Sequence, residues 1–278
     1  MFRCLLAVIS VIAATGVAHA AETGGRMVSM CQAIAARLPA SQYARLDKGV
    51  EPPVVMAAAP ARTESVRITY IDHSTYFIET PGGVTIATDY SGAYRMPATP
   101  TVVTMNKAHS GHYTLAPDPA IRHALQGWQD GGKAEHRLTV GDTYIRNVVS
   151  DLRSFGGGIE PGANSIFIFE TAGLCIGHVG HLHFELNDDQ IADIGRLDIV
   201  MIPVDGGLTM TAPSMRKTVQ RLRSSLVMLM HRRRAGALEE FLAGFGKDFA
   251  LDFSSTPTIS VSLKTLPKKP TIFIPPNL

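Results

Sequence analysis

The stretch that decides the fold is residues 101–112, which read TVVTMNKAHSGH. It begins with a short apolar run at 101–105, which has the length and composition of a buried β-strand. The chain then passes into a loop that carries His109 and His112. Loops that follow the strands of layered α/β proteins are where functional side chains gather, so these two histidines are candidate site residues.

The same arrangement of an apolar strand followed by histidines occurs twice more. The runs at 174–177 and 226–230 are followed by His178, His181, His183 and His231. A single histidine at a strand end is more often a hydrogen-bonded structural residue. Six histidines after three strands favour one shared polar or metal site. Neutral imidazole is a common zinc ligand, and a catalytic zinc typically has three protein ligands and one open position.

The rest of the chain alternates short strands with turns and, later, with helices. Strands are expected at 66–71, 76–79, 84–87, 144–149, 165–170 and 199–203, and helices at 188–194, 212–222 and 237–243. Early strands followed by alternating helices and strands predict an α/β (α+β) fold in which two sheets are sandwiched between helices.

The first twenty residues have the pattern of a cleavable signal peptide. Arg3 precedes an apolar run that ends in the small residues Ala18-His19-Ala20. The alternative is a membrane anchor, but the run is shorter than the roughly 20 apolar residues that span a bilayer. The sequence therefore divides into a signal peptide at 1–20, an N-terminal helix and linker at 21–64, and one domain at 65–278.

Composition restricts the partners of the mature chain. Hydrophobic residues make up 45% and charged residues 18% of the sequence, which suits a globular protein with a substantial core. The net charge of +2 becomes +1 once Arg3 is removed, so no general affinity for nucleic acid is expected. The basic cluster at 232–234 is more typical of a solvated loop. No later segment is long and apolar enough for stable membrane insertion.

Two cysteines, Cys31 and Cys175, remain after Cys4 leaves with the signal peptide. An oxidising compartment would permit a disulfide between them. Two cysteines do not make a disulfide framework, so the paired and the free forms both stay open.

From about Val66 to its end the chain resembles the metallo-β-lactamase superfamily, especially the branch that includes the ascorbate-phosphate lactonase and the phospholipase D that cleaves N-acyl phosphatidylethanolamine. The landmarks are, in order, IDHST at 71–75, Asp89, NKAHSGH at 106–112, ANSIF at 163–167, GHVGH at 177–181, IPVDGG at 202–207 and MLMH at 228–231. The resemblance implies a four-layer αββα sandwich with metals at one edge of its two sheets.

The metal motif of the superfamily, H-x-H-x-D-H, is altered in this chain. Lys107 stands at its first histidine and Gly111 at its aspartate. The next histidine of the superfamily falls near 149–153, where only Asp151 offers a ligand. Its bridging aspartate corresponds to His181, while its last histidine is kept as His231.

This resemblance implies a metal site made of His109, His112, His181 and His231. The preferred arrangement is a single zinc ion held by His112, His181 and His231, with His109 as a fourth ligand or behind the ligands. Another divalent metal is a further option. His73 belongs to the first landmark but is not one of the usual ligands of the superfamily.

Further residues are candidates for supporting roles. The Lys107 ammonium either replaces the missing first metal and holds a substrate oxyanion or extends into solvent. Asp205 either accepts a hydrogen bond from a ligand histidine or forms a turn. Asp89, which the superfamily has as a buried aspartate near the metals, is expected to support the site. His178 and His183 are expected to orient a ligand, although strand parity directs His178 away from its neighbours.

Two functions remain open at this point. One is an exported zinc-dependent hydrolase of an ester, lactone, amide or phosphoester, in which a metal-bound hydroxide attacks a small-molecule substrate in the periplasm or outside the cell. Lys107 and Asp205 are its expected catalytic residues. The other is a non-catalytic periplasmic protein of the same fold that binds a metal or a small ligand, which the loss of the motif aspartate favours.

Overall fold

The computed structural model describes residues 29–32 and 65–278. The predicted signal peptide at 1–20 and most of the extension at 21–64 lie outside the described residues. The domain at 65–278 consists of two β-sheets and a few helices. Among the described residues, no helix has the length and apolar character needed to cross a bilayer.

The first sheet contains six strands in the order β13-β1-β2-β3-β4-β5. Their bounds are β1 (Val66–Asp72), β2 (Thr75–Glu79), β3 (Thr85–Ala87), β4 (Val102–Met105), β5 (His123–Gln126) and β13 (Thr258–Val261). The pairs β1–β2 and β2–β3 are antiparallel, while β3–β4 and β4–β5 are parallel.

The second sheet contains eight strands in the order β12-β14-β11-β10-β9-β8-β7-β6. Their bounds are β6 (Arg137–Val140), β7 (Thr143–Arg153), β8 (Ile159–Thr171), β9 (Leu174–His178), β10 (Ile199–Pro203), β11 (Leu226–Met230), β12 (Ala250–Phe253) and β14 (Thr271–Ile274). Strands β9, β10 and β11 are parallel to one another, so their carboxyl ends lie at the same edge of the sheet.

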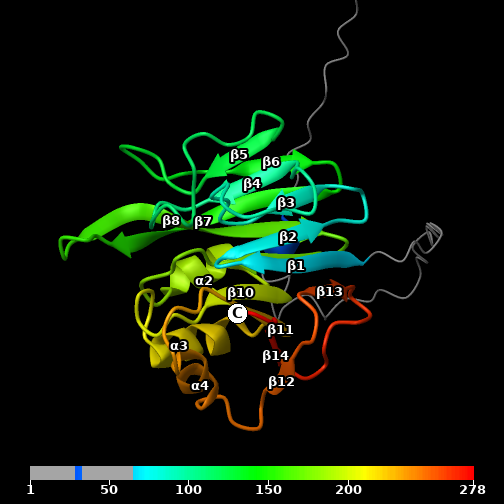
Figure 1. Ribbon diagram of the computed structural model, residues 1–278, viewed down its shortest axis with the longest axis vertical. Coiled ribbons are helices and arrows are strands. Elements are labelled where there is room, and N and C mark those ends of the chain that lie inside the picture. The colour runs from blue at the N-terminus through cyan, green and yellow to red at the C-terminus, as the bar shows by residue number, and fades with distance from the viewer. Residues whose placement is uncertain (1–28, 33–64) are drawn as a thin grey trace, which may run out of the picture.

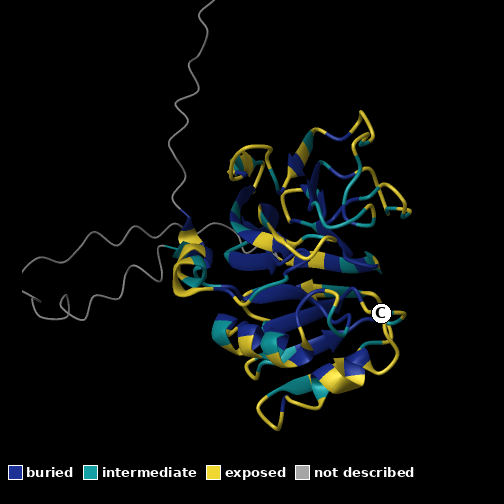
Figure 2. Cartoon of the chain, turned by 90° about the vertical axis from the view of Figure 1, so that its left-hand side faces the viewer, coloured by how far each residue is buried: buried dark blue, intermediate teal, exposed yellow. Residues whose placement is uncertain are grey.

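The main core lies between the two sheets, and alternation along the strands explains how it forms. Successive side chains of a strand point to opposite faces. In β2 and β3, Ile78 and Ile86 therefore join the core shared with the second sheet, while Phe77 and Ala87 point the other way. In Figure 2 the strands of both sheets are largely buried, and the exposed residues gather in loops.

The helices cover only one side of this sandwich. The helices α2 (Asp188–Ile194), α3 (Ala212–Leu222) and α4 (Ala237–Leu242) all follow β9 and gather beside the eight-stranded sheet (Figure 1). The chain from β1 to β9, all of it described, has no helix. The expected fold of two sheets with few helices is thus confirmed, and among residues 65–278 loops lie over the outer face of the six-stranded sheet.

These loops close over a small second core. It is formed by apolar residues on the outer face of the six-stranded sheet and in the loops that follow β3, β4 and β5: Phe77, Ala87, Tyr90, Val103, Met105 and Ile121, with Trp128 packed against them. Because the loop at 106–121 is held by apolar packing, His109 and His112 stand on a supported segment.

A disulfide joins Cys31 to Cys175, and it settles the pairing that the sequence left open. The short described segment around Cys31 is also fixed by the buried Glu170, whose carboxylate accepts hydrogen bonds from the Ser29 hydroxyl and the Met30 backbone N–H. Arg146 donates to the same carboxylate at 2.8 Å. The disulfide and this buried ion pair therefore bind the extension to the eight-stranded sheet.

Candidate metal centre

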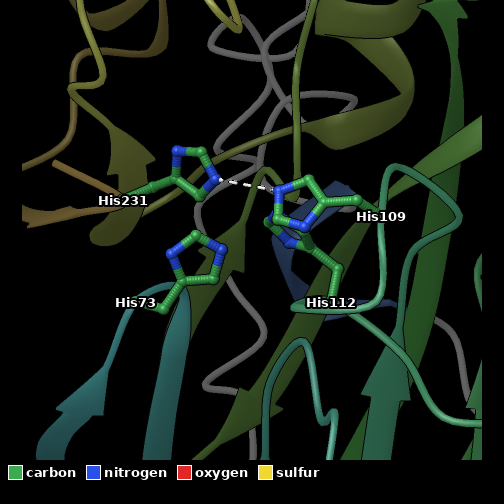
Figure 3. Close-up of side chains that lie close together, drawn as sticks. All are labelled: His73, His109, His112 and His231. Carbon is green, nitrogen blue, oxygen red and sulfur yellow. Dashed lines mark hydrogen bonds between the residues drawn. The ribbon is translucent and has the colours of Figure 1, made fainter. Parts of the chain in front are cut away.

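Four imidazoles converge at the edge of the sandwich where the carboxyl ends of β4 and β11 meet. His73 lies in the turn after β1, His109 and His112 in the loop after β4, and His231 after β11. Each offers one ring nitrogen, and the four nitrogens lie within 4.8 Å of one another. Figure 3 shows their rings facing a common centre from three separate segments.

The backbone at this centre adopts an unusual conformation. His73, Asp89 and His231 have φ values of 51°, 42° and 58°, in the left-handed region. Residues with a side chain enter this region rarely and at a cost, and such positions cluster at functional sites. The conformation turns the chain sharply at the strand end and directs both imidazoles back toward the centre.

His112 is oriented by a buried carboxylate. Its Nδ1 lies 2.6 Å from Asp89 Oδ2, and the side chains of both residues are fully buried. The Asn106 amide donates to the other oxygen of Asp89 at 2.9 Å. Burial raises the pKa of Asp89, and a cation at the site would favour its ionised form again. With Asp89 ionised, the Nδ1 proton of His112 points at the carboxylate and the Nε2 lone pair faces the centre.

His231 lies against a buried carboxylate from a different segment. Its Nδ1 lies 3.0 Å from Asp205 Oδ2, but the geometry is not that of a hydrogen bond. Asp205 also accepts hydrogen bonds from the backbone N–H groups of Gly207 and Thr209. Burial opposes ionisation of Asp205, but the contacts from His231 and these N–H groups prevail and lower its pKa to about 2. Asp205 therefore lies where it can position His231, which is one of the two roles considered for it from the sequence.

His181 belongs to a chain of hydrogen bonds that ends in the backbone. The Arg153 N–H donates to His183 Nδ1 at 2.6 Å, so the proton of a neutral His183 is on Nε2. That Nε2 lies 2.7 Å from His181 Nδ1 and donates to it. It follows that a neutral His181 carries its own proton on Nε2, where it is a hydrogen-bond donor.

A second group of candidate ligands, formed by His181, Asp205 and His231, overlaps the first through His231. It is less suited to an ion, because the oxygens of Asp205 already accept from two backbone N–H groups and lie against His231. In the four-histidine group, no hydrogen-bond donor competes with an ion for His73, because its buried Nε2 has no hydrogen-bond partner among the described residues.

His178 lies apart from the centre, as strand parity predicted. Its Nε2 lies 2.8 Å from the Ser74 carbonyl oxygen, and its Nδ1 accepts from the Gly180 N–H at 3.2 Å. Both ring nitrogens are thereby used by the backbone. His178 holds the turn after β1, and with it the backbone next to His73, against the end of β9.

Two residues proposed from the sequence do not join the imidazoles. Asp151 is exposed on β7 and accepts a hydrogen bond from the Gly162 N–H at 2.8 Å. Lys107 forms an ion pair with Glu160, which differs from both positions considered for it. The hydrogen bond to Glu160 raises the pKa of Lys107 and keeps it protonated. The Lys107 ammonium is therefore already paired with the Glu160 carboxylate.

His73 is the member of the cluster that the sequence did not identify as a ligand. His73 directly follows the end of a strand, as the other histidines do, and this position in the sequence could have identified it as a candidate ligand. However, β1 belongs to the other sheet, and only the folded chain brings its turn against β11. The ring centroids of His73 and His231 are 4.1 Å apart.

Burial favours the neutral form of His73, His109, His112 and His181. Burial lowers the pKa of His112, His109 and His181, and neighbouring histidines lower them further. Burial also lowers the pKa of His73 to about 2. Neutral imidazole is the form that binds a divalent metal. The donor set and the unpartnered His73 nitrogen both fit a zinc-type ion.

A cavity of about 620 Å³ opens beside the cluster. Its lining includes His109, His181 and His183 together with Leu152, Phe155, Leu208 and Arg233. Phe155 is fully exposed and Leu208 is 58% exposed, so an apolar surface stands open at the cavity. The cavity therefore offers both imidazoles and apolar side chains to a ligand.

Comparison with known proteins agrees with this arrangement. Residues 67–231 match the family model described as the β-lactamase superfamily domain, which is more than half of the chain. The chain belongs to the metallo-β-lactamase superfamily. Its matched region begins in β1 and ends at His231, so it contains every member of the histidine cluster.

Individual members of the superfamily are only distantly similar. A UPF0173 metal-dependent hydrolase from Methanoculleus marisnigri is 23% identical over 214 residues, which cover 71% of this chain and 93% of that protein. A structure from Thermotoga maritima, described as a Zn-dependent hydrolase of the metallo-β-lactamase superfamily, aligns with a TM-score of 0.54 and 19% identity over 75% of this chain and 98% of that one. An isothiocyanate hydrolase from Delia radicum gut bacteria aligns with a TM-score of 0.52 and 12% identity over 70% and 99%. At these identities the structures establish the fold alone.

Proposed function

We propose that this protein is an exported zinc-dependent hydrolase that acts on a small ester, lactone, amide or phosphoester at a mononuclear site. The observation that carries the proposal is the cluster of four imidazoles within 4.8 Å of one another, one of which, His109, also lines an open cavity. When bound, a divalent ion polarises a substrate oxygen and lowers the pKa of a bound water to about 7.

The residues of the chain supply the remaining requirements of such a reaction. His109 and His181 line the cavity, and the Nε2–H of a neutral His181 is available to donate to a substrate oxygen on which negative charge develops. Arg233 adds a positive charge at the wall. Lys107 is left out of this role because Glu160 already holds its ammonium.

The cavity walls favour a substrate with an apolar group. Leu152, Phe155 and Leu208 offer apolar contact, while Arg233 can attract an anionic group. Burial of apolar surface contributes about 25 cal/mol per Å². An acyl or aryl ester therefore suits the cavity better than a fully polar substrate.

Export is supported by two features that are independent of the site. The first twenty residues have the pattern of a signal peptide. Cys31 and Cys175 are joined by a disulfide, which persists in oxidising compartments. Intact-mass measurement of protein from the periplasmic fraction tests this part, and the expected product begins at Ala21. A chain recovered with Met1 in the cytoplasm would contradict it.

The hydrolase is tested with protein purified without a His tag, stripped of metal and assayed on nitrophenyl esters, lactones and phosphodiesters. We expect turnover that requires Zn²⁺, is abolished by a chelator and returns on addition of zinc. His112→Ala should lose it, whereas Asp151→Asn, at an exposed position outside the cluster, should retain it. Protein that binds zinc but hydrolyses none of these substrates would contradict the proposal.

A non-catalytic binding protein is the second candidate, and the departures at Lys107 and Gly111 favour it. It differs from the hydrolase in its expected outcome: one zinc per chain, a ligand that protects the protein against thermal unfolding, and no turnover. The same assays therefore separate the two.

A further inference from the structure

We propose that His73 is a metal ligand of this site, together with His112 and His231. Gly111 has no side chain, and this leaves the space that the His73 imidazole occupies. His181, expected from the sequence to be the third ligand, then acts as a hydrogen-bond donor beside the ion. This inference rests on the proposed function, since it presupposes that the cluster holds a metal.

The position of His73 is the first support. Its ring centroid lies 4.1 Å from that of His231 and 4.9 Å from that of His112. The side chain is buried, and its Nε2 has no hydrogen-bond partner among the described residues. A buried polar atom in a folded protein nearly always has a partner. A bound cation would supply one.

Gly111 provides the second support. A Cβ atom placed on Gly111 would lie 2.9 Å from His73 Nε2 and 2.9 Å from His109 Cε1. Both distances are too short for a real contact. Gly111 is not one of the glycines with a positive φ, so its backbone does not require glycine. A side chain at 111 would therefore displace the imidazoles of His73 and His109, which share this space.

The third support is the direction of the rings. His112 Nδ1 lies 2.6 Å from Asp89 Oδ2, which turns its Nε2 toward the centre, where it lies 3.1 Å from His109 Nε2. His231 Nδ1 lies 3.0 Å from Asp205 Oδ2, and its Nε2 lies 3.5 Å from the same His109 nitrogen. An ion that displaced these contacts with His109 would meet the Nε2 atoms of His112, His231 and His73, and three is the number of protein ligands typical of a catalytic zinc.

The other two histidines present protons. His181 Nδ1 accepts from His183, so its Nε2 carries the proton. His109 Nδ1 accepts from the Gly111 N–H at 3.2 Å, which assigns its proton to Nε2 as well. An N–H group cannot ligate a metal, but it can donate to an oxygen next to one. The five imidazoles therefore divide into three ligands and two donors.

Zinc binding tests this division. Metal-free wild type and variants are titrated with Zn²⁺ in competition with a chromophoric chelator. His73→Asn is the main variant because asparagine tolerates a positive φ. We expect His73→Asn to weaken zinc binding by at least about 100-fold, beyond the effect usual for residues behind the ligands. His181→Asn, the matched control, should change it by less than about tenfold.

A compensating variant provides a stricter test. In His73→Asn/Gly111→Asp, a carboxylate at 111 would reach the space that the imidazole vacates, and it should recover at least about tenfold of the lost zinc affinity. If His73→Asn does not fold, Gly111→Ala replaces it, because the added Cβ displaces His73 without removing it and should also weaken binding. X-ray absorption of bound zinc should show one imidazole fewer in His73→Asn than in wild type.

The outcomes distinguish this inference from the proposed function. A wild type that binds no zinc would overturn both. The inference would be overturned if His73→Asn bound zinc as tightly as wild type does. It would also be overturned if His181→Asn lost as much zinc affinity as His73→Asn. Either result would leave the zinc hydrolase standing.

Discussion

The backbone N–H of His231 donates to the carbonyl oxygen of His73 at 2.7 Å, and both residues have a positive φ. This bond joins a turn of the six-stranded sheet to the end of a strand of the eight-stranded sheet. Two imidazoles of the cluster are thereby fixed to each other through their backbones. The geometry of the site therefore depends on the packing of the two sheets.

The strained backbone at His231 predicts a difference between two substitutions that both remove an imidazole. His231→Asn and His231→Ala should each lose zinc binding. His231→Asn should unfold at a higher temperature than His231→Ala, by the equivalent of about 1 kcal/mol, because asparagine tolerates the left-handed region better. Thermal melts of the two variants in chelator check this. Equal melting temperatures would indicate that the turn relaxes when the ring is removed.

Asp89 and Asp205, which lie against the Nδ1 atoms of His112 and His231, should affect metal affinity without contacting the ion. We expect Asp205→Asn and Asp89→Asn to weaken zinc binding by about 10- to 100-fold, since each removes the group that orients an imidazole. Asp151→Asn is the matched control and should bind zinc as wild type does, because Asp151 is exposed and bonded only to the Gly162 N–H. Isothermal titration would measure all three. An Asp151→Asn as weak as Asp205→Asn would contradict the assignment.

Much of the fold follows from local patterns in the sequence. The expected strands at 199–203 and 226–230 and the expected helices at 188–194 and 212–222 agree with β10, β11, α2 and α3. These elements have strong apolar periodicity and clear caps, such as Asn187 at the start of α2. Two of the strands that escaped prediction, β6 and β12, are short edge strands with mixed burial, so their apolar pattern is weak.

The site was predictable as a cluster but not in its internal arrangement. Histidines at three strand ends indicated His109, His112, His181 and His231 as one group, and the fold brings these rings together. Which rings offer lone pairs depends on contacts between distant segments. The Arg153 N–H that fixes His183, and the turn that brings His73 to His231, are tertiary features with no local signal in the sequence.

The apolar wall of the cavity should determine substrate preference. Phe155→Ser is expected to raise KM for long-chain nitrophenyl esters several-fold more than for the acetyl ester, because Phe155 is exposed at the cavity and its apolar surface is available only to long chains. Zinc content should stay unchanged. Phe253→Ser, an exposed phenylalanine on β12 that does not line the cavity, is the control. Equal changes in KM for both ester lengths would exclude Phe155 from the substrate site.

The buried histidines predict how the stability of the metal-free protein changes with pH. Burial lowers the pKa of His73 to about 2 and that of His183 to about 4. Below about pH 6.5 the unfolded chain binds protons at these residues that the folded chain does not. The free energy of unfolding should therefore fall as pH decreases from 6.5 to 4, by up to about 1.4 kcal/mol per pH unit for each histidine.

Urea denaturation in chelator at pH 7.5, 6 and 5 would measure this fall. His183→Gln should show a smaller decrease than wild type, because it removes one of the contributing groups. A free energy of unfolding that is constant across this range would show that the imidazoles are protonated as readily in the folded chain as in the unfolded one.

The disulfide should stabilise the fold without influencing the metal centre. It closes a loop with a sequence separation of 144, for which chain entropy predicts about 5 kcal/mol of stabilisation. Cys175 lies near the start of β9, while His181 follows the end of that strand. We therefore expect Cys31→Ser/Cys175→Ser to lower the urea midpoint strongly, yet to bind zinc as wild type does at 25 °C. If zinc affinity fell together with stability, the extension around Cys31 would have to act on the site through β9, and the domain at 65–278 would not be sufficient to form the metal centre.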